Sequence, residues 1–151
     1  MPSKKTINSS HIETLLSCPF VHHVRGRCEK FRINFSLSLS SDCLCISDGD
    51  TTDGFFDPPS RTTPGTLCLS VAGKDLSEIY HTLAHEFCHL EQWVRDDALW
   101  VKWMKRSTRK STLALERRTE EEALEMLKTW NLYDDSMLDR MNKYLRRLEN
   151  S

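Results

Sequence analysis

Long hydrophobic runs are absent from this sequence of 151 residues, and so is any strong excess of charge of one sign. No apolar stretch reaches the roughly 20 residues of a membrane span, and the polar start, Met1 to Thr6, leads into no run of signal-peptide length. We therefore expect a cytoplasmic protein with no membrane partner. The length predicts a single domain over residues 1–151, which is large enough to bury a core without disulfides.

Zinc-knuckle and disulfide patterns are also missing, although the sequence contains six cysteines. Without an export signal, an even number of cysteines does not argue for disulfides, and the spacing of Cys43, Cys45 and Cys88 fits no zinc knuckle. We therefore expect reduced cysteines that are buried as small apolar residues.

Apolar periodicity predicts an α+β fold. A capping box at Ser10 starts a short helix that Pro19 ends. Alternation over 31–39 predicts a strand, paired as a hairpin with a second strand at 43–46, and a third strand follows at 66–71 after an irregular segment, 48–65. Helices are predicted over 75–97, 98–105, 116–130 and 136–148. The expected fold is a small domain in which a short antiparallel sheet packs on the 75–97 helix and on the downstream 116–130 helix, with a C-terminal helix.

The most informative stretch, His85-Glu86-Phe87-Cys88-His89, reads H-E-x-x-H and lies inside a predicted helix. That helix is well supported because no Gly or Pro interrupts it and Asp75 provides an N-cap. Helical positions four apart share a face, so His85 and His89 should converge on one point with Glu86 at its flank. This is half of a zinc site.

A catalytic zinc usually has three protein ligands, so one more is needed. The metzincin pattern is excluded because Gln92 and Arg95 stand where it requires Gly and His. Among five glutamates of the 116–130 helix, Glu120 lies on the core-facing stripe, where a metal would stabilise its charge. Glu120 is therefore the predicted ligand. Glu116, one turn earlier, shares the face and stays open as the ligand or as an acceptor for a histidine N–H.

His85-Glu86-x-x-His89 followed by Glu120-x-x-Ala123 resembles the gluzincin branch of zinc metallopeptidases, in the compact form of ImmA/IrrE-like and small phage-encoded or SprT-like metallopeptidases. The resemblance covers residues 65–132. Two departures are visible: Leu124 stands where gluzincins often have Asp or Asn, and no histidine follows His89, whereas SprT-like proteins commonly use a third. The resemblance implies a small zincin-like domain, in which the 116–130 helix supplies the ligand glutamate, and a zinc (Zn²⁺) cofactor on His85, His89 and Glu120.

The predicted function is a zinc-dependent peptidase that hydrolyses peptide bonds of a protein substrate through a metal-activated water, with Glu86 as the catalytic base. An extended segment is the expected substrate because a chain of this size has little room for a deep cleft, and an edge strand beside the metal could bind it. The donor that stabilises the developing oxyanion stays open among several residues: His81, Tyr80, Tyr133, His22 and His23.

The alternative is a non-catalytic zinc-containing module that binds DNA or protein through the basic stretch 102–118, in which Trp100 and Trp103 are interleaved with the cations that begin at Lys102. A solvated connecting segment explains that stretch better, so the sequence predicts at most a weak contact with nucleic acid. A metal-free scaffold is a third alternative, which the intact His85, Glu86 and His89 disfavour.

Overall fold

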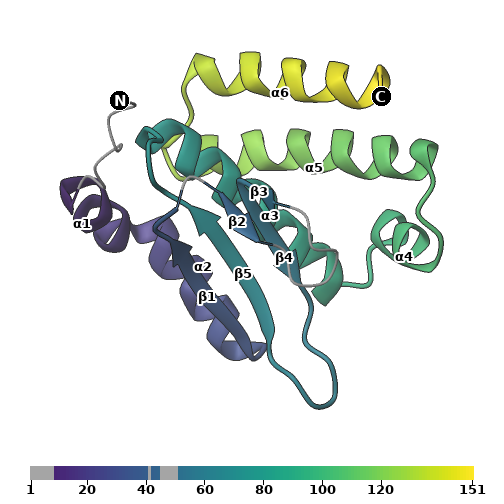
Figure 1. The fold of residues 1–151 in the computed structure, drawn as a ribbon, viewed down its shortest axis with the longest axis horizontal. Helices are drawn as coiled ribbons and strands as arrows, with labels where there is room; N and C mark the ends of the chain where they lie inside the picture. The colour runs from purple at the N-terminus through teal and green to yellow at the C-terminus, as the bar shows by residue number, and fades with distance from the viewer. Residues whose placement is uncertain (1–8, 41, 45–50) are drawn as a thin grey trace.

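The computed structural model describes residues 9–40, 42–44 and 51–151. Over these residues the chain is of mixed α and β structure, as predicted (Figure 1). Its helices are α1 (Ser9–Ser17), α2 (Pro19–Lys30), α3 (Leu76–Val94), α4 (Ala98–Lys105), α5 (Arg109–Thr129) and α6 (Asp135–Glu149). Its strands are β1 (Ile33–Ser38), β2 (Cys43–Leu44), β3 (Thr51–Thr52), β4 (Gly54–Asp57) and β5 (Gly65–Ser70). A search of the described helices found none that could cross a membrane.

The main sheet is mixed, so the expectation of an antiparallel sheet is wrong. Its strand order is β1-β5-β4, in which β5 pairs with β1 in parallel and with β4 in antiparallel fashion. The predicted hairpin is also wrong, because β2 pairs with β3, with Cys43 opposite Thr52, and residues 45–46 lie outside the described part. The alternation of apolar and polar residues in β1 is compatible with either pairing. A period of two determines which face of a strand is buried, but it does not determine which strand is its neighbour.

Pro19 begins a helix as well as ending one. α1 stops at Ser17, and Pro19 is the first residue of α2, a position where the missing N–H costs no hydrogen bond. α2 was not predicted. It packs against β1 and buries four side chains: Phe20, Val21, Val24 and Cys28.

The segment 48–65, expected to be irregular, contains the edge strand β4, which packs against α3. Gly54 allows this close approach. A Cβ on Gly54 would lie 2.7 Å from Cγ2 of Thr82 and 3.0 Å from the carbonyl oxygen of Cys68. The absence of a side chain therefore brings the edge of the sheet directly onto α3.

α3 matches its prediction, and the Asp75 side chain accepts a hydrogen bond from the backbone N–H of Glu78 as its N-cap. α5 starts at Arg109 rather than at Glu116, because Thr108 and Ser111 form a capping box that the sequence reading missed. α5 packs on α3, and α6 lies beside α5 and also contacts α3 (Figure 1). Three helices thus meet around the H-E-x-x-H segment.

The main cluster of buried apolar residues includes members from all six helices and from the main sheet. Leu83 and Leu90 of α3 and Leu115 and Leu127 of α5 are completely buried at the junction of these two helices. The five cysteines in the described part are free and buried, as predicted. Apolar burial therefore holds α3 and α5 together and fixes the side chains that project between them.

Candidate metal centre

His85 and His89 converge as the helical spacing predicts. The apolar stripe of α3, which includes Leu83, Phe87 and Leu90, is buried in the core, and the two histidines stand beside it. Their Nε2 atoms lie 3.2 Å apart. Two nitrogens bonded to one tetrahedral zinc at about 2.05 Å would be about 3.3 Å apart, so the observed spacing already suits a shared metal.

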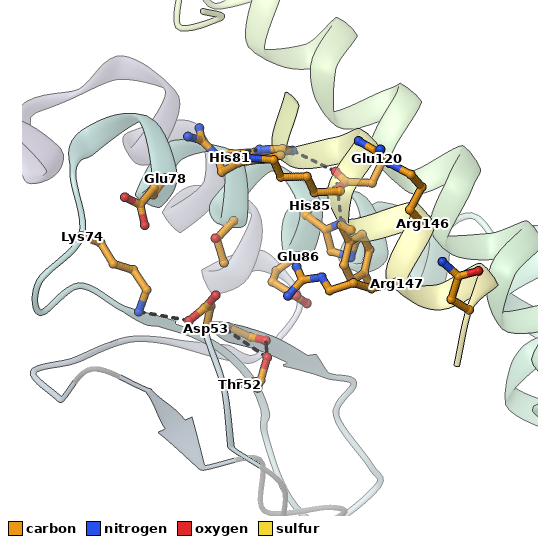
Figure 2. Close-up of a pocket in the computed structure, with 16 residues that line it drawn as sticks. Thr52, Asp53, Lys74, Glu78, His81, His85, Glu86, Glu120, Arg146 and Arg147 are labelled. Atoms are coloured by element: carbon orange, nitrogen blue, oxygen red, sulfur yellow. Dashed lines mark hydrogen bonds and ion pairs between the residues drawn. The ribbon is translucent and has the colours of Figure 1, made fainter. Parts of the chain in front are cut away.

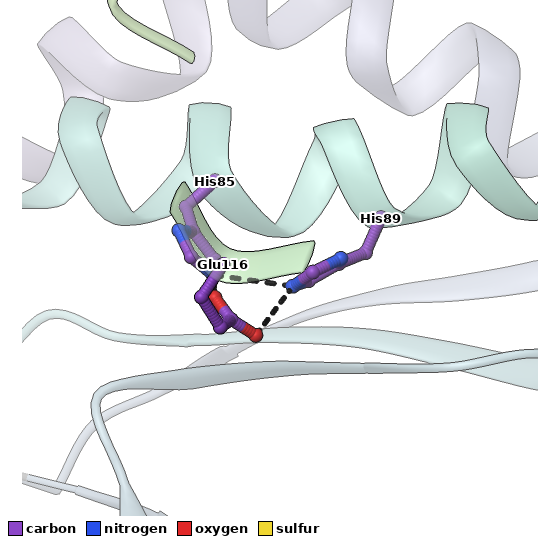
Figure 3. A group of neighbouring side chains, drawn as sticks. All are labelled: His85, His89 and Glu116. Carbon is purple, nitrogen blue, oxygen red and sulfur yellow. Dashed lines mark hydrogen bonds and ion pairs between the residues drawn. The ribbon is translucent and has the colours of Figure 1, made fainter. Parts of the chain in front are cut away.

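Glu116 of α5 completes the group (Figure 3). Its Oε2 lies 2.8 Å from Nε2 of His85, and its Oε1 lies 3.3 Å from Nε2 of His89. One ligand atom from each of the three side chains falls within 4.8 Å of the others, so this group could hold a metal ion. The residue that α5 adds to this group is Glu116, the candidate one turn before Glu120.

The group fits a cation because its acceptor atoms face one another. Oε2 of Glu116 is buried and has no hydrogen-bond partner of acceptable geometry, although it lies 2.8 Å from His85. Burial disfavours charge on His85, but the Glu116 carboxylate outweighs it and raises the pKa of His85 well above its usual range. Burial likewise opposes charge on Glu116, and the two imidazoles outweigh it and hold its pKa below the usual range. A divalent cation would satisfy both groups at once.

A buried chain of hydrogen bonds orients His89. The hydroxyl of Thr119 donates to the carbonyl of Leu115, and therefore accepts from Nε2 of Gln92. The amide oxygen of Gln92 then faces Nδ1 of His89 at 2.9 Å and accepts its N–H. Because Nδ1 carries the proton, the lone pair of Nε2 is available to a metal.

Glu120 projects inward, as its helical phase predicts, and is only 4% exposed. Its Oε2 accepts from Nε2 of His81 at 2.9 Å and lies 3.5 Å from Nδ1 of His85. Burial would raise the pKa of Glu120, but hydrogen bonds from His81 and His85 outweigh it and lower the pKa to about 2. Glu120 therefore contacts the far nitrogen of a metal-site histidine, while Glu116 faces the near nitrogen.

His81 connects Glu120 to the C-terminal helix. Nε of Arg140 donates to Nδ1 of His81 at 3.4 Å, which leaves Nε2 of His81 to donate to Glu120. The same guanidinium binds the hydroxyls of Ser77 and Ser136 at 2.6 and 3.2 Å. His81, one of the oxyanion-donor candidates, is thus engaged on both ring nitrogens.

A cavity of about 990 Å³ opens beside this group (Figure 2). Glu86 lines it together with His81, His85 and Glu120, and lies outside the three-residue metal group. Burial raises the pKa of Glu86, and this outweighs the neighbouring imidazoles. Glu86 therefore lies next to the metal group and faces the cavity, and its role as a base stays a prediction.

Tyr144 of α6 is the site residue that sequence reasoning missed. It lines the same cavity, and its ring packs edge-on against His85 with centroids 5.9 Å apart. Burial, reinforced by the nearby carboxylates, raises the pKa of Tyr144, so its hydroxyl keeps its proton and can donate. The spacing of apolar residues over 136–148 predicts that Tyr144 lies on the packed face of a helix. The structure adds that α6 crosses α3, which brings this face to the metal group.

The other oxyanion-donor candidates lie elsewhere. His23 packs on Phe87 and Trp130, and His22 is exposed and does not line the cavity. Tyr133 lies under Lys128, and the Tyr80 hydroxyl faces Cys18. Burial, together with Cys18, raises the pKa of Tyr80 to about 12. None of these four side chains lines the cavity.

The basic stretch 102–118 is partly used inside the fold. Arg117 pairs with Glu149 of α6 at 2.6 Å, and Arg118 pairs with Asp97. Trp100 is buried with its ring 5.5 Å from that of His89, and Trp103 donates to a threonine hydroxyl. The two tryptophans therefore pack beside the metal group: Trp100 contacts His89, and Trp103 contacts Trp100.

A scan of protein-family models and searches of characterised proteins and of solved structures found no match for this chain.

Proposed function

We propose that this protein is a zinc-dependent peptidase of the gluzincin type. The observation that carries the proposal is the convergence of His85, His89 and Glu116 next to a cavity that is lined by His85 and Glu86. Two imidazole nitrogens and one carboxylate are the ligand set of a catalytic zinc site, in which one coordination position is left for water or substrate. A structural zinc site would instead be closed by a fourth protein ligand, usually a cysteine, and none of the cysteines in the described part of the chain lines the cavity.

When bound, zinc would supply Lewis-acid activation of water and of the scissile carbonyl. Glu86 would take the proton of the attacking water and deliver it to the leaving amine. A carboxylate with a raised pKa is well matched to both transfers, because it holds the proton between the two steps. Its place at the cavity, outside the metal group, keeps it free for this task.

Tyr144 is proposed to donate a hydrogen bond to the substrate carbonyl oxygen as negative charge develops there. Its ring lies against His85, and its raised pKa keeps the donor proton in place. Gln92 accepts from Nδ1 of His89, and the Glu120 carboxylate lies 3.5 Å from Nδ1 of His85, so both are proposed to hold the imidazoles in one orientation.

The substrate is proposed to be an extended segment of polypeptide. β4 is an edge strand of the sheet, and its first residue, Gly54, lines the cavity. The edge of β4 that β5 leaves free offers backbone N–H and C=O groups that can pair with an extended chain. This corrects the expectation for the strand at 66–71, since that strand, β5, lies in the middle of the sheet.

The test is zinc loading combined with the Glu86→Gln variant. Wild-type protein should bind one zinc per chain and hydrolyse peptides in a proteome-derived peptide mixture, as read by mass spectrometry. Glu86→Gln should keep the zinc and lose the hydrolysis, because the amide preserves shape and removes the base. Glu121→Gln, on the exposed face of α5, is the matched control and should retain both properties. Hydrolysis by Glu86→Gln at the wild-type rate would overturn the role of Glu86.

A further inference from the structure

The cavity wall opposite the sheet is formed by one face of α6, and that face is strongly basic. Arg140, Lys143, Tyr144 and Arg147 recur at helical spacing and line the cavity together with Arg146. Figure 2 shows Arg146 and Arg147 on the same side of the cavity as His85 and Glu120. We define this set, Arg140, Lys143, Arg146 and Arg147, as the basic wall.

The basic wall lies next to the reacting centre. Tyr144 contacts His85, and Lys143 precedes it in the sequence while Arg147 follows one helical turn later. A polypeptide that reached the metal group would therefore pass these cations within about one turn of α6, or about 5 Å along the helix.

Most of the basic wall has no acidic partner in the described part of the chain. Lys143 and Arg147 make no hydrogen bond or ion pair with any described residue, and Arg146 donates only to the carbonyl of Asn142. Arg140 is used by His81 and two serine hydroxyls. Glu149, two residues after Arg147, is bound by Arg117 of α5.

The helix dipole favours cations near the C-terminal end of a helix, and this explains why arginine occurs at positions 146 and 147 in the last turn of α6. The dipole does not require them to face the cavity, and it leaves Lys143 unexplained. The common property of Lys143, Arg146 and Arg147 is that they line the space beside the metal group.

We infer that the basic wall selects polypeptide segments that carry acidic side chains next to the bond brought to the metal group. This inference rests on the proposed peptidase function for the identity of the site and adds its substrate class. A polypeptide suits the cavity better than a nucleic acid, because Glu78 and Glu86 also line it and would repel a continuous row of phosphates. In a peptide, unlike a nucleic acid, acidic groups can be limited to the positions that face the cations of the basic wall. The peptide backbone can also pair with the edge of β4.

The experiment measures binding by the zinc-loaded Glu86→Gln protein, so that a cleavable probe stays intact. Fluorescence anisotropy would compare a labelled twelve-residue peptide of alternating Glu and Ala with its Gln and Ala counterpart. Three exposed ion pairs predict about tenfold tighter binding of the Glu peptide at low salt, with the preference falling as salt is raised. Lys143→Gln/Arg147→Gln should reduce the preference to about twofold.

The matched control is Lys102→Gln/Lys105→Gln, which removes the same charge from exposed positions of α4 outside the cavity. It should keep the wild-type preference. Equal binding of the two peptides, or an equal loss in both double variants, would overturn the inference. Tighter binding of a single-stranded oligonucleotide that depends on Lys143 and Arg147 would also overturn it, in favour of nucleic acid. Because the readout is binding, failure to find any hydrolysis would count against the peptidase proposal alone.

Discussion

Replacing Glu116 or Glu120 by Gln separates the two carboxylates that α5 brings to the histidines. Gln keeps the length and shape of the side chain and removes the charge, so the packing of α5 on α3 should be preserved. Glu116→Gln should weaken zinc binding much more than Glu120→Gln, because only Glu116 faces the Nε2 atoms of both His85 and His89. The ranking of the two variants is therefore a direct test of the geometry.

The structure also sets the size of each effect. Glu116 offers a charged oxygen in a site where its side chain is only 12% exposed, so its loss as a direct ligand should cost more than 100-fold in zinc affinity, which is more than about 2.7 kcal/mol. Glu120 contacts Nδ1 of His85 across 3.5 Å, which is the limit of a hydrogen bond. Its loss should therefore lower zinc affinity by about tenfold, the low end of the range for residues that orient a metal ligand.

Zinc affinity would be measured by competition with a chelating dye, beside wild type and Glu121→Gln, an exposed position on the same helix that should change affinity by less than about twofold. Circular dichroism of each metal-free variant would establish that α3 and α5 remain folded. The assignment of the metal group fails if Glu116→Gln stays within tenfold of wild type, or if Glu120→Gln is the weaker binder.

Three further changes test the surroundings of the site. Gln92→Leu should lower zinc affinity by about 10- to 100-fold, because Nδ1 of His89 loses its acceptor; wild-type affinity would show that this chain does not orient the histidine. Tyr144→Phe should leave zinc affinity unchanged and lower kcat by about 100-fold, and an unchanged kcat would remove Tyr144 as a donor. Gly54→Ala should destabilise the fold by about 1 to 3 kcal/mol in thermal unfolding, because its Cβ would meet Thr82. Gly26→Ala, in open space on α2, should instead be neutral or stabilise by up to about 1 kcal/mol, and equal effects at the two glycines would refute the close packing of β4 on α3.

Local signals predicted the helices of the site well. The Asp75 cap and an uninterrupted apolar period defined α3, and the fixed geometry of a helix then required His85 and His89 to converge. The same rule placed Glu120 inward. It could not rank Glu120 against Glu116, because both lie on one face and the choice depends on where α5 crosses α3, which the sequence of α5 alone does not specify.

Non-local features were not predictable in this way. A period of two identified β1, but its pairing with β5 depends on residues about 30 positions away, and the short β2 pairs with β3 instead. Pro19 predicts the end of α1 but does not by itself predict α2, although proline is also favoured at the first position of a helix. The position of Tyr144 beside the metal group was equally unpredictable, because it depends on a non-local contact, the packing of α6 across α3.

The C-terminal helix forms one wall of the cavity and is attached to the rest of the fold near both of its ends. Near its start Met137 is completely buried, one turn later Arg140 binds Ser77 and His81 of α3, and at its end Glu149 pairs with Arg117. The opposite wall is attached as well, since β4 is hydrogen-bonded to β5 and pressed onto α3 at Gly54. Under the proposed function, a substrate would have to fit between these two walls, and an extended, locally unfolded segment would meet this requirement while a folded domain would not.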